Sequence, residues 1–351
     1  MMLPASPAPF AEVAARVADL ERAGLDAVLV PEAYSFDAVS QVGYLAARTE
    51  RLEIGTGIVN VYSRSATLLG QTAAGCDYVS GGRFLLGVGV SGPQVIEGFH
   101  GIPYERPRSR TLDCIEVVRK VVAREVLVHE GPTVEVPLRD GRGTGLGKPL
   151  KLINRPVRPA VPIWWAAMLG KAVESAAEVA DGWMPLMFVP EAADDVWGAA
   201  LAAGRARRSR MLGPLEVVAG GRVAVGDDVP VDDVLDDARA SAALYVGGMG
   251  ARGKNFYNEI VSRAGFADAA RTIQDHYLDG RKDQAAAAVP RELLDRLHLV
   301  GPAGHIRERV AAFRAAGVTT LMVEPVGEDP VRTIERLREI VDEIGRESKE
   351  T

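Results

Sequence analysis

Residues 52–90 decide the fold, because two short apolar runs flank one helix-like segment there. The first run is Leu52-Glu53-Ile54-Gly55-Thr56-Gly57-Ile58-Val59, and the second is Phe84-Leu85-Leu86-Gly87-Val88-Gly89-Val90. Residues 65–80, between them, have helical spacing that ends at Gly81-Gly82. Short, almost wholly apolar strands that are joined through a helix indicate a parallel sheet covered by helices.

The same alternation continues on both sides of this stretch. Further strands are predicted at 27–30, 163–167, 182–187, 215–225 and 319–323. Further helices are predicted at 9–23, 37–48, 109–124, 170–180, 190–210, 231–245 and 330–346. These seven strands are one fewer than a closed barrel needs. We therefore predict an α/β fold, a (β/α)8 TIM-like barrel whose first strand, within residues 1–5, is short or truncated.

Two stretches do not fit the repeat. Residues 126–160 contain a predicted hairpin at 126–136 and a Gly-rich loop at 141–149. Residues 246–300 are polar and helical. We predict one barrel domain over 1–351 with these two insertions, which in a barrel usually serve as lids or oligomer contacts.

The composition, with 47% apolar and 25% charged residues, is that of an ordinary soluble protein. A net charge of −6 argues against a nucleic-acid binder, which would carry a basic excess. Cys76 and Cys114 are far apart and are interpreted as buried thiols of a reducing compartment. No apolar run is long enough to span a membrane, and the N-terminus lacks a signal-peptide pattern, so we expect a cytoplasmic protein.

Several motif matches fail because of their surroundings. Residues 87–92 match the dinucleotide-binding pattern G-x-G-x-x-G, but Pro93 and Gly98 are expected to break the helix that the pattern requires. The Gly-rich residues 141–148 lack the Ser or Thr of a phosphate loop, since Pro149 follows the lysine, and they are interpreted as a surface loop. The spacing of the histidines predicts no metal site, and the hydrolase pattern G-x-S-x-G is absent.

Polar residues follow three of the predicted strands, at the barrel end where catalytic groups lie. Glu32 follows the strand at 27–30, and Asn60, Tyr62 and Arg64 follow the strand at 52–59. Gly170-Lys171 begin the helix after the strand at 163–167, where free backbone N–H groups and a lysine suit a phosphate. A helix-capping acid, a surface loop and a plain strand-to-helix turn are the alternatives that stay open at these places.

Several of these stretches together resemble the bacterial luciferase-like family of flavin and deazaflavin proteins. They are residues 55–65 (GTGIVNVYSRS), 80–89 (SGGRFLLGVG), 162–167 (PIWWAA), 180–182 (ADG) and 315–320 (AAGVTT). The similarity runs from about residue 8 to 345 and is specific as a combination of motifs. Within the family the sequence is most similar to the coenzyme F420-dependent branch, which includes methylenetetrahydromethanopterin reductase.

The resemblance implies a dimeric barrel with F420 at the C-terminal ends of its strands and a cis peptide bond between Gly57 and Ile58 behind the deazaflavin ring. Carried over residue by residue, it assigns cofactor contacts to Glu32, Gly57, Ile58, Asn60, Val90, Ser91, Met168, Leu169, Lys171 and Ala172. Glu32 is the candidate catalytic residue, as a proton relay. The candidate substrate contacts are Tyr62, Gln94 and Asn255.

Two positions depart from the F420-dependent glucose-6-phosphate dehydrogenases, which place a histidine and a glutamate where this sequence has Ala33 and Gly92. Oxidation of sugar phosphates is therefore rejected. The predicted function is an F420-dependent oxidoreductase that exchanges a hydride between C5 of the deazaflavin and a small organic substrate. Lys171 and the Arg106, Arg108 and Arg110 cluster would pair with the anionic cofactor tail, although a solvated helix start explains the arginines equally well.

Two other functions stay open at this point. One is an FMN-dependent monooxygenase that uses O₂, because flavin and deazaflavin suit the same barrel. The other is a non-catalytic flavin-binding barrel, for which the short first strand is the support.

Overall fold

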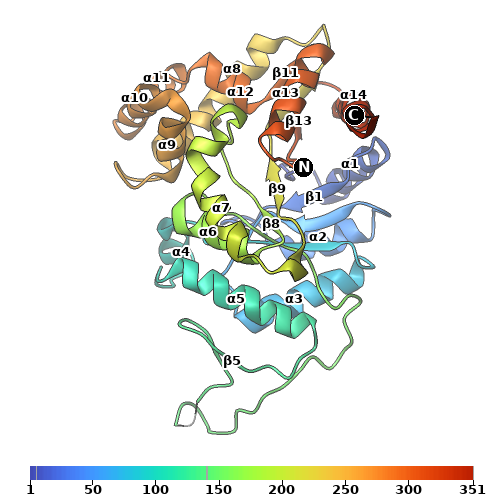
Figure 1. Ribbon diagram of the computed structural model, residues 1–351, viewed down its shortest axis with the longest axis vertical. Coiled ribbons are helices and arrows are strands. Elements are labelled where there is room, and N and C mark those ends of the chain that lie inside the picture. The colour runs from blue at the N-terminus through green and yellow to red at the C-terminus, as the bar shows by residue number, and fades with distance from the viewer. Residues whose placement is uncertain (5, 140, 351) are drawn as a thin grey trace.

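The computed structural model describes residues 1–4, 6–139 and 141–350, and its centre is a parallel sheet that curls inside a layer of helices (Figure 1). Each strand pairs in parallel with the next in the order β1 (Ala27–Val30), β2 (Glu53–Thr56), β4 (Phe84–Gly89), β7 (Ile163–Trp165), β8 (Gly182–Trp183), β9 (Glu216–Ala219) and β12 (Thr320–Leu321). A short strand, β3 (Val59–Asn60), follows β2 and also pairs with β4. The predicted α/β barrel class is confirmed.

Residues Met1–Leu3 occupy the position of the predicted first strand. Met2 forms a parallel bridge with Leu29. Leu3 N–H donates to Leu29 O at 2.8 Å, and Leu29 N–H donates to Met1 O at 2.8 Å. The predicted short first strand is thus present, beside β1.

The inside of the curled sheet is filled by one layer of apolar side chains. Each strand position supplies at least one of them, namely Met2, Leu29, Ile58, Leu85, Trp164, Ala166, Met184, Val218 and Met322. Because residues from the first and the last strand positions pack against the same layer, the sheet wraps around it as a barrel wall does.

The glycines of residues 52–90 allow β2 and β4 to approach very closely. The buried Thr56 hydroxyl donates to Gly87 O at 2.7 Å and accepts from Gly87 N–H at 2.9 Å. A Cβ atom on Gly87 would lie 1.9 Å from Thr56 O, so no other residue fits there without moving the backbone.

Two predicted strands are interrupted. The expected cis peptide bond between Gly57 and Ile58 is present and divides the strand predicted at 52–59 into β2 and β3. The strand predicted at 215–225 is β9 and β10 (Arg222–Val225), separated at Gly220-Gly221. β10 pairs with β11 (Leu299–Gly301) and β13 (Glu324–Pro325) in a second sheet beyond the barrel. β11 lies in a stretch predicted to be only helical.

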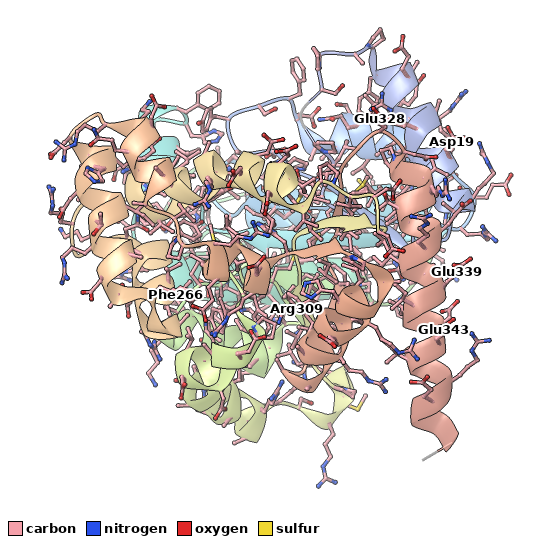
Figure 2. The ribbon with its side chains drawn as sticks, turned by 90° about the horizontal axis from the view of Figure 1, so that it is seen from above. Asp19, Phe266, Arg309, Glu328, Glu339 and Glu343 are labelled. Atoms are coloured by element: carbon pink, nitrogen blue, oxygen red, sulfur yellow. The ribbon has the colours of Figure 1, made fainter. Side chains whose placement is uncertain are left out.

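The covering helices agree with the predicted ranges to within a few residues. They are α1 (Phe10–Arg22), α2 (Ala38–Ala46), α3 (Ala66–Val79), α5 (Pro107–Val122), α6 (Gly170–Val179), α8 (Val231–Ala243) and α14 (Pro330–Glu350). A further covering helix, α13 (Ala303–Ala315), was not predicted. The segment predicted as one helix at 190–210 is instead a 3-10 turn at Pro190–Ala192, a π-helical turn at Asp194–Gly198, α7 (Ala199–Arg207) and a second 3-10 turn at Arg210–Leu212. α1 and α14 pack together, and Figure 2 shows Asp19 and Glu339 on them.

The expectation that Pro93 and Gly98 break any helix is wrong, because α4 runs over Pro93–Gly98. Proline suits the first position of a helix, where its missing N–H would have had no intrahelical partner. The helix is only six residues long and ends at Gly98.

The insertion at 246–300 is helical as predicted and lies at the upper left of Figure 1. It holds α9 (Phe256–Val261), α10 (Ala267–Leu278), α11 (Lys282–Ala287) and α12 (Arg291–Leu297). The Arg296 guanidinium lies 5.7 Å from the ring centre of Phe266, and Arg309 of α13 donates to Arg296 O at 2.6 Å. The first contact lies within the insertion, and the second, at the place where Figure 2 labels Arg309, joins the insertion to α13.

The insertion at 126–160 contains the predicted hairpin, which is β5 (His129–Glu130) and β6 (Glu135–Val136). Buried Asp113 of α5 accepts from the backbone N–H of Thr133 at 2.8 Å and of Val134 at 3.1 Å. Its other oxygen lies 3.2 Å from His129 Nε2. These contacts fix the hairpin along α5.

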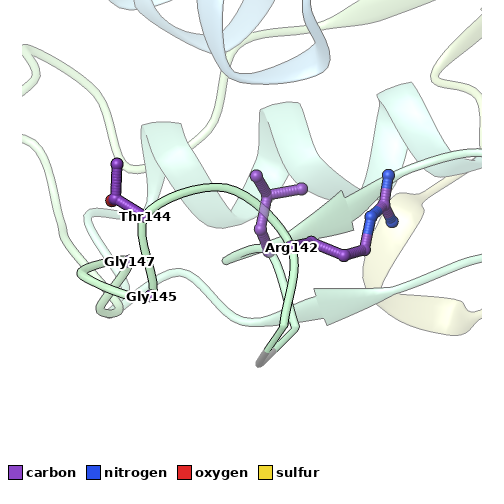
Figure 3. A pocket seen from close by; sticks show the side chains of 5 residues that line it. Arg142, Thr144, Gly145 and Gly147 are labelled. Carbon is purple, nitrogen blue, oxygen red and sulfur yellow. The ribbon is translucent and has the colours of Figure 1, made fainter.

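The Gly-rich loop that follows the hairpin is exposed, as expected for a surface loop. A hollow of about 150 Å³ lies in it (Figure 3), lined by Leu138, Arg142, Thr144, Gly145 and Gly147. The loop precedes β7, so it enters the barrel from the end opposite to the one where the strands terminate. Within the described residues, no helix has the length and apolar character needed to cross a bilayer.

We expect Gly87→Ala to lower the free energy of unfolding by about 3 kcal/mol or more, because the added Cβ would overlap the Thr56 carbonyl. Gly75→Ala in α3 is the matched control, since a Cβ there meets nothing within 4 Å. This control should be neutral or stabilise by about 0.5–1 kcal/mol. Urea unfolding of both variants measures the difference, and equal stabilities would contradict the close approach of β2 and β4.

His298 predicts a loss of stability in acid. Its Nδ1 accepts from Arg222 N–H at 3.1 Å, and burial, with the nearby Arg222 charge, lowers the pKa of the imidazole from 6.5 to about 4. Since the unfolded chain binds this proton more readily, the contribution is complete above pH 6.5 and is lost as the pH falls towards 4. His298→Asn, which keeps an acceptor but does not titrate, should flatten the stability profile in this interval. His276→Gln, at a half-buried histidine of α10, is the control variant.

Candidate functional site

Three loops meet at the C-terminal ends of β1, β3 and β4, and we call them the rim. They are residues 31–37 after β1, 61–65 after β3 and 90–106 after β4. In a barrel of parallel strands these ends lie together, which is why ligands and catalytic groups collect there.

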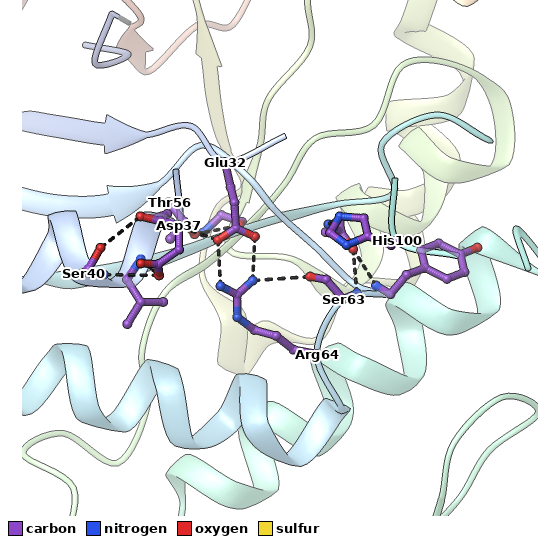
Figure 4. Close-up of polar contacts among 12 residues, drawn as sticks. Glu32, Asp37, Ser40, Thr56, Ser63, Arg64 and His100 are labelled. Carbon is purple, nitrogen blue, oxygen red and sulfur yellow. Dashed lines mark hydrogen bonds and ion pairs between the residues drawn. The ribbon is translucent and has the colours of Figure 1, made fainter. Parts of the chain in front are cut away.

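Glu32 and Arg64 form a bidentate ion pair that joins the first two loops (Figure 4). Arg64 Nη1 donates to Glu32 Oε1 at 2.6 Å, and Nη2 donates to Oε2 at 2.7 Å. Both side chains are mostly buried, with 15% and 9% of their surfaces exposed. The hydrogen-bonded carboxylate raises the pKa of the Arg64 guanidinium above its ordinary value. Charge-assisted bidentate pairs of this kind hold both partners in one geometry.

The carboxylate of Glu32 is fully engaged within the protein. Besides the arginine, Oε2 accepts the backbone N–H of Ala38 at 3.1 Å, at the start of α2. The capping alternative for Glu32 is therefore realised, together with an ion pair that sequence reasoning did not find. The proton-relay role of Glu32 stays a prediction.

Asn60, at the end of β3, connects its own loop to residue 100 of the loop after β4. Its Oδ1 accepts the backbone N–H groups of Tyr62 at 3.0 Å and Ser63 at 2.7 Å. Its Nδ2 lies 3.3 Å from His100 Nε2. Figure 4 shows His100 beside Ser63, on the far side of Arg64 from Asp37.

Tyr62 holds the loop after β4 in place and has little surface left for a substrate. Only 3% of it is exposed, and its hydroxyl donates to Glu105 O at 2.9 Å. Its ring stacks on Tyr104 with centroids 5.4 Å apart. Burial, and then the neighbouring Tyr104, raise the pKa of Tyr62 to about 12, so the phenol stays neutral.

Three residues at the rim, Ala33, Ser91 and Arg106, have backbone conformations that side chains rarely adopt, and Arg106 has φ of 46°. Ala33, directly after Glu32, has φ of 43°, and Ser91, after β4, has φ of 53°. Tyr104 Oη donates to Ser91 O at 3.3 Å and so supports that turn. Such positions collect at functional sites, where the surrounding structure holds them.

The turn after β7 presents free backbone N–H groups at the start of α6. The indole of Trp183 donates to Ala167 O at 2.8 Å, and that of Trp197 donates to Met168 O at 2.8 Å. Among the described residues, no side chain caps the N-terminus of α6, which begins at Gly170. Lys171 is exposed and pairs with Glu174 at 2.7 Å. An uncapped helix N-terminus next to a lysine suits an anion.

The remaining predicted residues do not gather in one place. Gln94 is exposed on α4. Asn255 is buried and caps α9 through its Oδ1, while its Nδ2 donates to Tyr245 O and Val246 O at 3.0 Å each, so its hydrogen-bonding groups are used within the helical insertion. Val90 and Ser91 are half-buried at the rim, as are Ile58 and Gly57 between β2 and β3.

The arginine cluster binds the protein itself. Arg110 donates to Val61 O at 2.9 Å and lies 4.8 Å from the centre of the Tyr62 ring. Arg108 donates to Ser175 Oγ at 2.8 Å, and Arg106 donates to Pro132 O at 3.2 Å. These contacts favour a structural role for the cluster over binding of the cofactor tail.

Sequence reasoning missed His100 and Tyr104 as parts of the rim. Both lie in the loop that follows β4, and the rule that placed Glu32 after its strand applies to them too. In the sequence they lie farther from the end of their strand than Glu32 does from the end of β1, and the unpredicted α4 lies between β4 and both residues.

The comparisons with known proteins identify the family. The family model for luciferase-like monooxygenases matches residues 1–320. The chain belongs to this family. It is 38% identical, over 92% of each chain, to a Mycobacterium tuberculosis protein assigned as a coenzyme F420-dependent oxidoreductase.

Solved structures of luciferase-like proteins share the fold. The coenzyme F420-dependent tetrahydromethanopterin reductase of Methanopyrus kandleri superposes with a TM-score of 0.75 at 19% identity, over 96% of this chain and 95% of that one. The oxygenating constituent of 3,6-diketocamphane monooxygenase from Pseudomonas putida, in complex with FMN, gives a TM-score of 0.64 at 16% identity, over 97% and 96%.

We expect Arg64→Leu to lower the free energy of unfolding by about 3–5 kcal/mol, because it leaves the Glu32 carboxylate buried without its cation. The double variant Glu32→Leu/Arg64→Leu should lose less than the sum of the single losses, because no lone charge remains. Arg271→Leu, which breaks an exposed pair with Asp268, is the control and should cost less than about 1 kcal/mol. Urea unfolding of Glu32→Leu, Arg64→Leu and the double variant measures the three losses. If the two single losses add up to the loss of the double variant, Glu32 and Arg64 act independently.

Proposed function

We propose that the protein is a coenzyme F420-dependent oxidoreductase that transfers a hydride between the deazaflavin C5 and a small organic substrate. The observation that carries this proposal is the 38% identity, over 92% of each chain, to the F420-dependent relative. The barrel, the loops at its rim and the uncapped start of α6 are compatible with it.

The residues present suit the anionic part of such a cofactor. The Trp183 and Trp197 indoles occupy the carbonyl groups of the turn after β7, which leaves the N–H groups of α6 available to phosphate oxygens. Lys171 adds a positive charge there, and its flexible, exposed side chain can leave Glu174 for a phosphate at small cost. The phosphodiester of F420 would therefore bind at Met168–Ala172.

The chain's own residues position the reactants. The ion pair of Glu32 with Arg64 holds the loop after β1 against the loop after β3. Tyr62 and Tyr104 hold the loop after β4 above the end of β3, where Ile58 and Val90 provide apolar surface for a flat ring. When bound, F420 supplies a hydride donor or acceptor, and this rim aligns the substrate with it.

FMN is the alternative cofactor, and the family likeness to an FMN-bound monooxygenase supports it. A helix N-terminus with a lysine accepts the phosphate of either molecule. The higher identity to the F420-dependent relative makes F420 our first choice. The homodimer and the cytoplasmic location stay predictions.

Titration of the purified protein with F420 and, separately, with FMN tests the proposal. We expect quenching or a shift of the cofactor fluorescence with F420 at lower concentration than with FMN. Lys171→Ala should weaken F420 binding about two- to fivefold, as expected for one charge near a helix N-terminus. Lys282→Ala, in the helical insertion, is the control and should bind normally. Tight binding of FMN without binding of F420 would overturn the choice of cofactor.

A further inference from the structure

We infer that His100 is a neutral hydrogen-bond donor that binds a carbonyl oxygen of the substrate, and that Asn60 positions it by fixing its tautomer. The inference rests on the proposed oxidoreductase function and names the class of its substrate, a carbonyl compound.

The orientation of the Asn60 amide is set by the backbone. Its Oδ1 accepts two N–H groups, from Tyr62 at 3.0 Å and from Ser63 at 2.7 Å. Only 1% of Asn60 is exposed, so water does not compete for these bonds. A flipped amide would place its NH₂ group against both backbone donors, and the NH₂ group therefore faces His100.

This orientation decides where the imidazole carries its proton. Asn60 Nδ2 can only donate, so His100 Nε2, at 3.3 Å, has to accept. The neutral ring then carries its proton on Nδ1. Among the residues that the structure describes, no hydrogen bond to His100 Nδ1 is present, and this N–H is available to a ligand.

The ring lies at the rim beside exposed aromatic surface. The Phe99 ring meets the His100 ring edge-on, with ring centres 5.2 Å apart, and the ring centres of Tyr34 and Phe99 are 6.4 Å apart. Tyr34 and Phe99 are 68% and 65% exposed. A donor bordered by aromatic side chains suits a substrate with one polar oxygen on an apolar body.

Several polar groups of the rim are engaged within the protein. Both oxygens of Glu32 accept hydrogen bonds from Arg64, and the hydroxyl groups of Tyr62 and Tyr104 donate to backbone carbonyls. The position after Glu32 is Ala33, which has no polar side chain. His100 Nδ1 can therefore donate to a substrate oxygen without breaking an internal contact, which Glu32, Tyr62 and Tyr104 cannot.

Reduction of a carbonyl group at this place balances in atoms and electrons. The reduced deazaflavin supplies the hydride, with its two electrons, to the carbonyl carbon, and the C=O π bond becomes a lone pair on oxygen. The Nδ1–H of His100 stabilises this negative charge as it develops, as hydrogen-bond donors do in oxyanion holes. Water at the exposed rim then provides the proton that completes the alcohol and leaves as hydroxide, while the proton on His100 Nδ1 stays in place.

The first test observes the histidine directly, without turnover. Long-range ¹H–¹⁵N spectra of protein labelled in histidine distinguish the two neutral tautomers and the imidazolium. His100→Gln assigns the signal, and His276→Gln assigns the signal of a control histidine in the helical insertion. We expect the Nδ1–H tautomer for His100 at pH 7. We expect Asn60→Asp, which places an acceptor against Nε2, to convert it to the Nε2–H or imidazolium form.

The second test adds cyclohexanone as the carbonyl probe, with and without saturating oxidised F420. The His100 Nδ1–H signal should move with the ketone, while the His276 signal should not. An Nε2–H tautomer or an imidazolium in the unaltered protein at pH 7 would overturn the inference. No response to cyclohexanone in the F420-loaded protein would overturn the carbonyl assignment.

These outcomes separate the two proposals. Failure of F420 to bind in the fluorescence titration defeats the proposed function, whatever form His100 takes. Binding of F420 with the wrong tautomer defeats only the role of His100.

Discussion

The contact between Thr56 and Gly87 is the constraint on which the candidate site depends. One buried hydroxyl bonds to both the N–H and the carbonyl of Gly87, and a Cβ there would lie 1.9 Å from Thr56 O. β2 and β4 are thereby held together at the point where the chain passes from β2 to β3. β3 then pairs with β4 so that Asn60 lies opposite Gly89. The amide that organises the rim is thus placed by backbone geometry inside the barrel wall.

The rim is built so that each loop depends on another. Arg64 of the loop after β3 holds Glu32 of the loop after β1, while Tyr62 and Asn60 hold the loop after β4 through Glu105 and His100. The loop after β3 is therefore the common partner, and its short length keeps its atoms close to the strand end. A site made in this way is fixed before a ligand arrives, which lowers the entropy that binding has to overcome.

The fold was predictable from the sequence because its strands are short apolar runs and glycines mark the ends of two of its early helices, at Gly24 and Gly81. Boundaries failed where backbone geometry has no side-chain signature, as at Gly220-Gly221, or where a proline opens a helix, as at Pro93. At the site, the rule that functional groups follow strands located Glu32 and Asn60. It did not show that Arg64 occupies the Glu32 carboxylate, or that the Asn255 groups serve the helical insertion, because such pairings depend on loops that meet only in three dimensions.

The position of His100 explains how one barrel can change its chemistry without changing its strands. Directly after Glu32 the backbone of Ala33 is left-handed, with φ of 43°, and its side chain offers no donor. The donor comes instead from the end of α4, in a loop that the barrel tolerates at many lengths. A histidine in that loop reaches the strand end only because Tyr62 and Tyr104 hold the loop down. Since the Asn60 amide faces Nε2 of the ring, the loop presents Nδ1 to polarise a substrate oxygen.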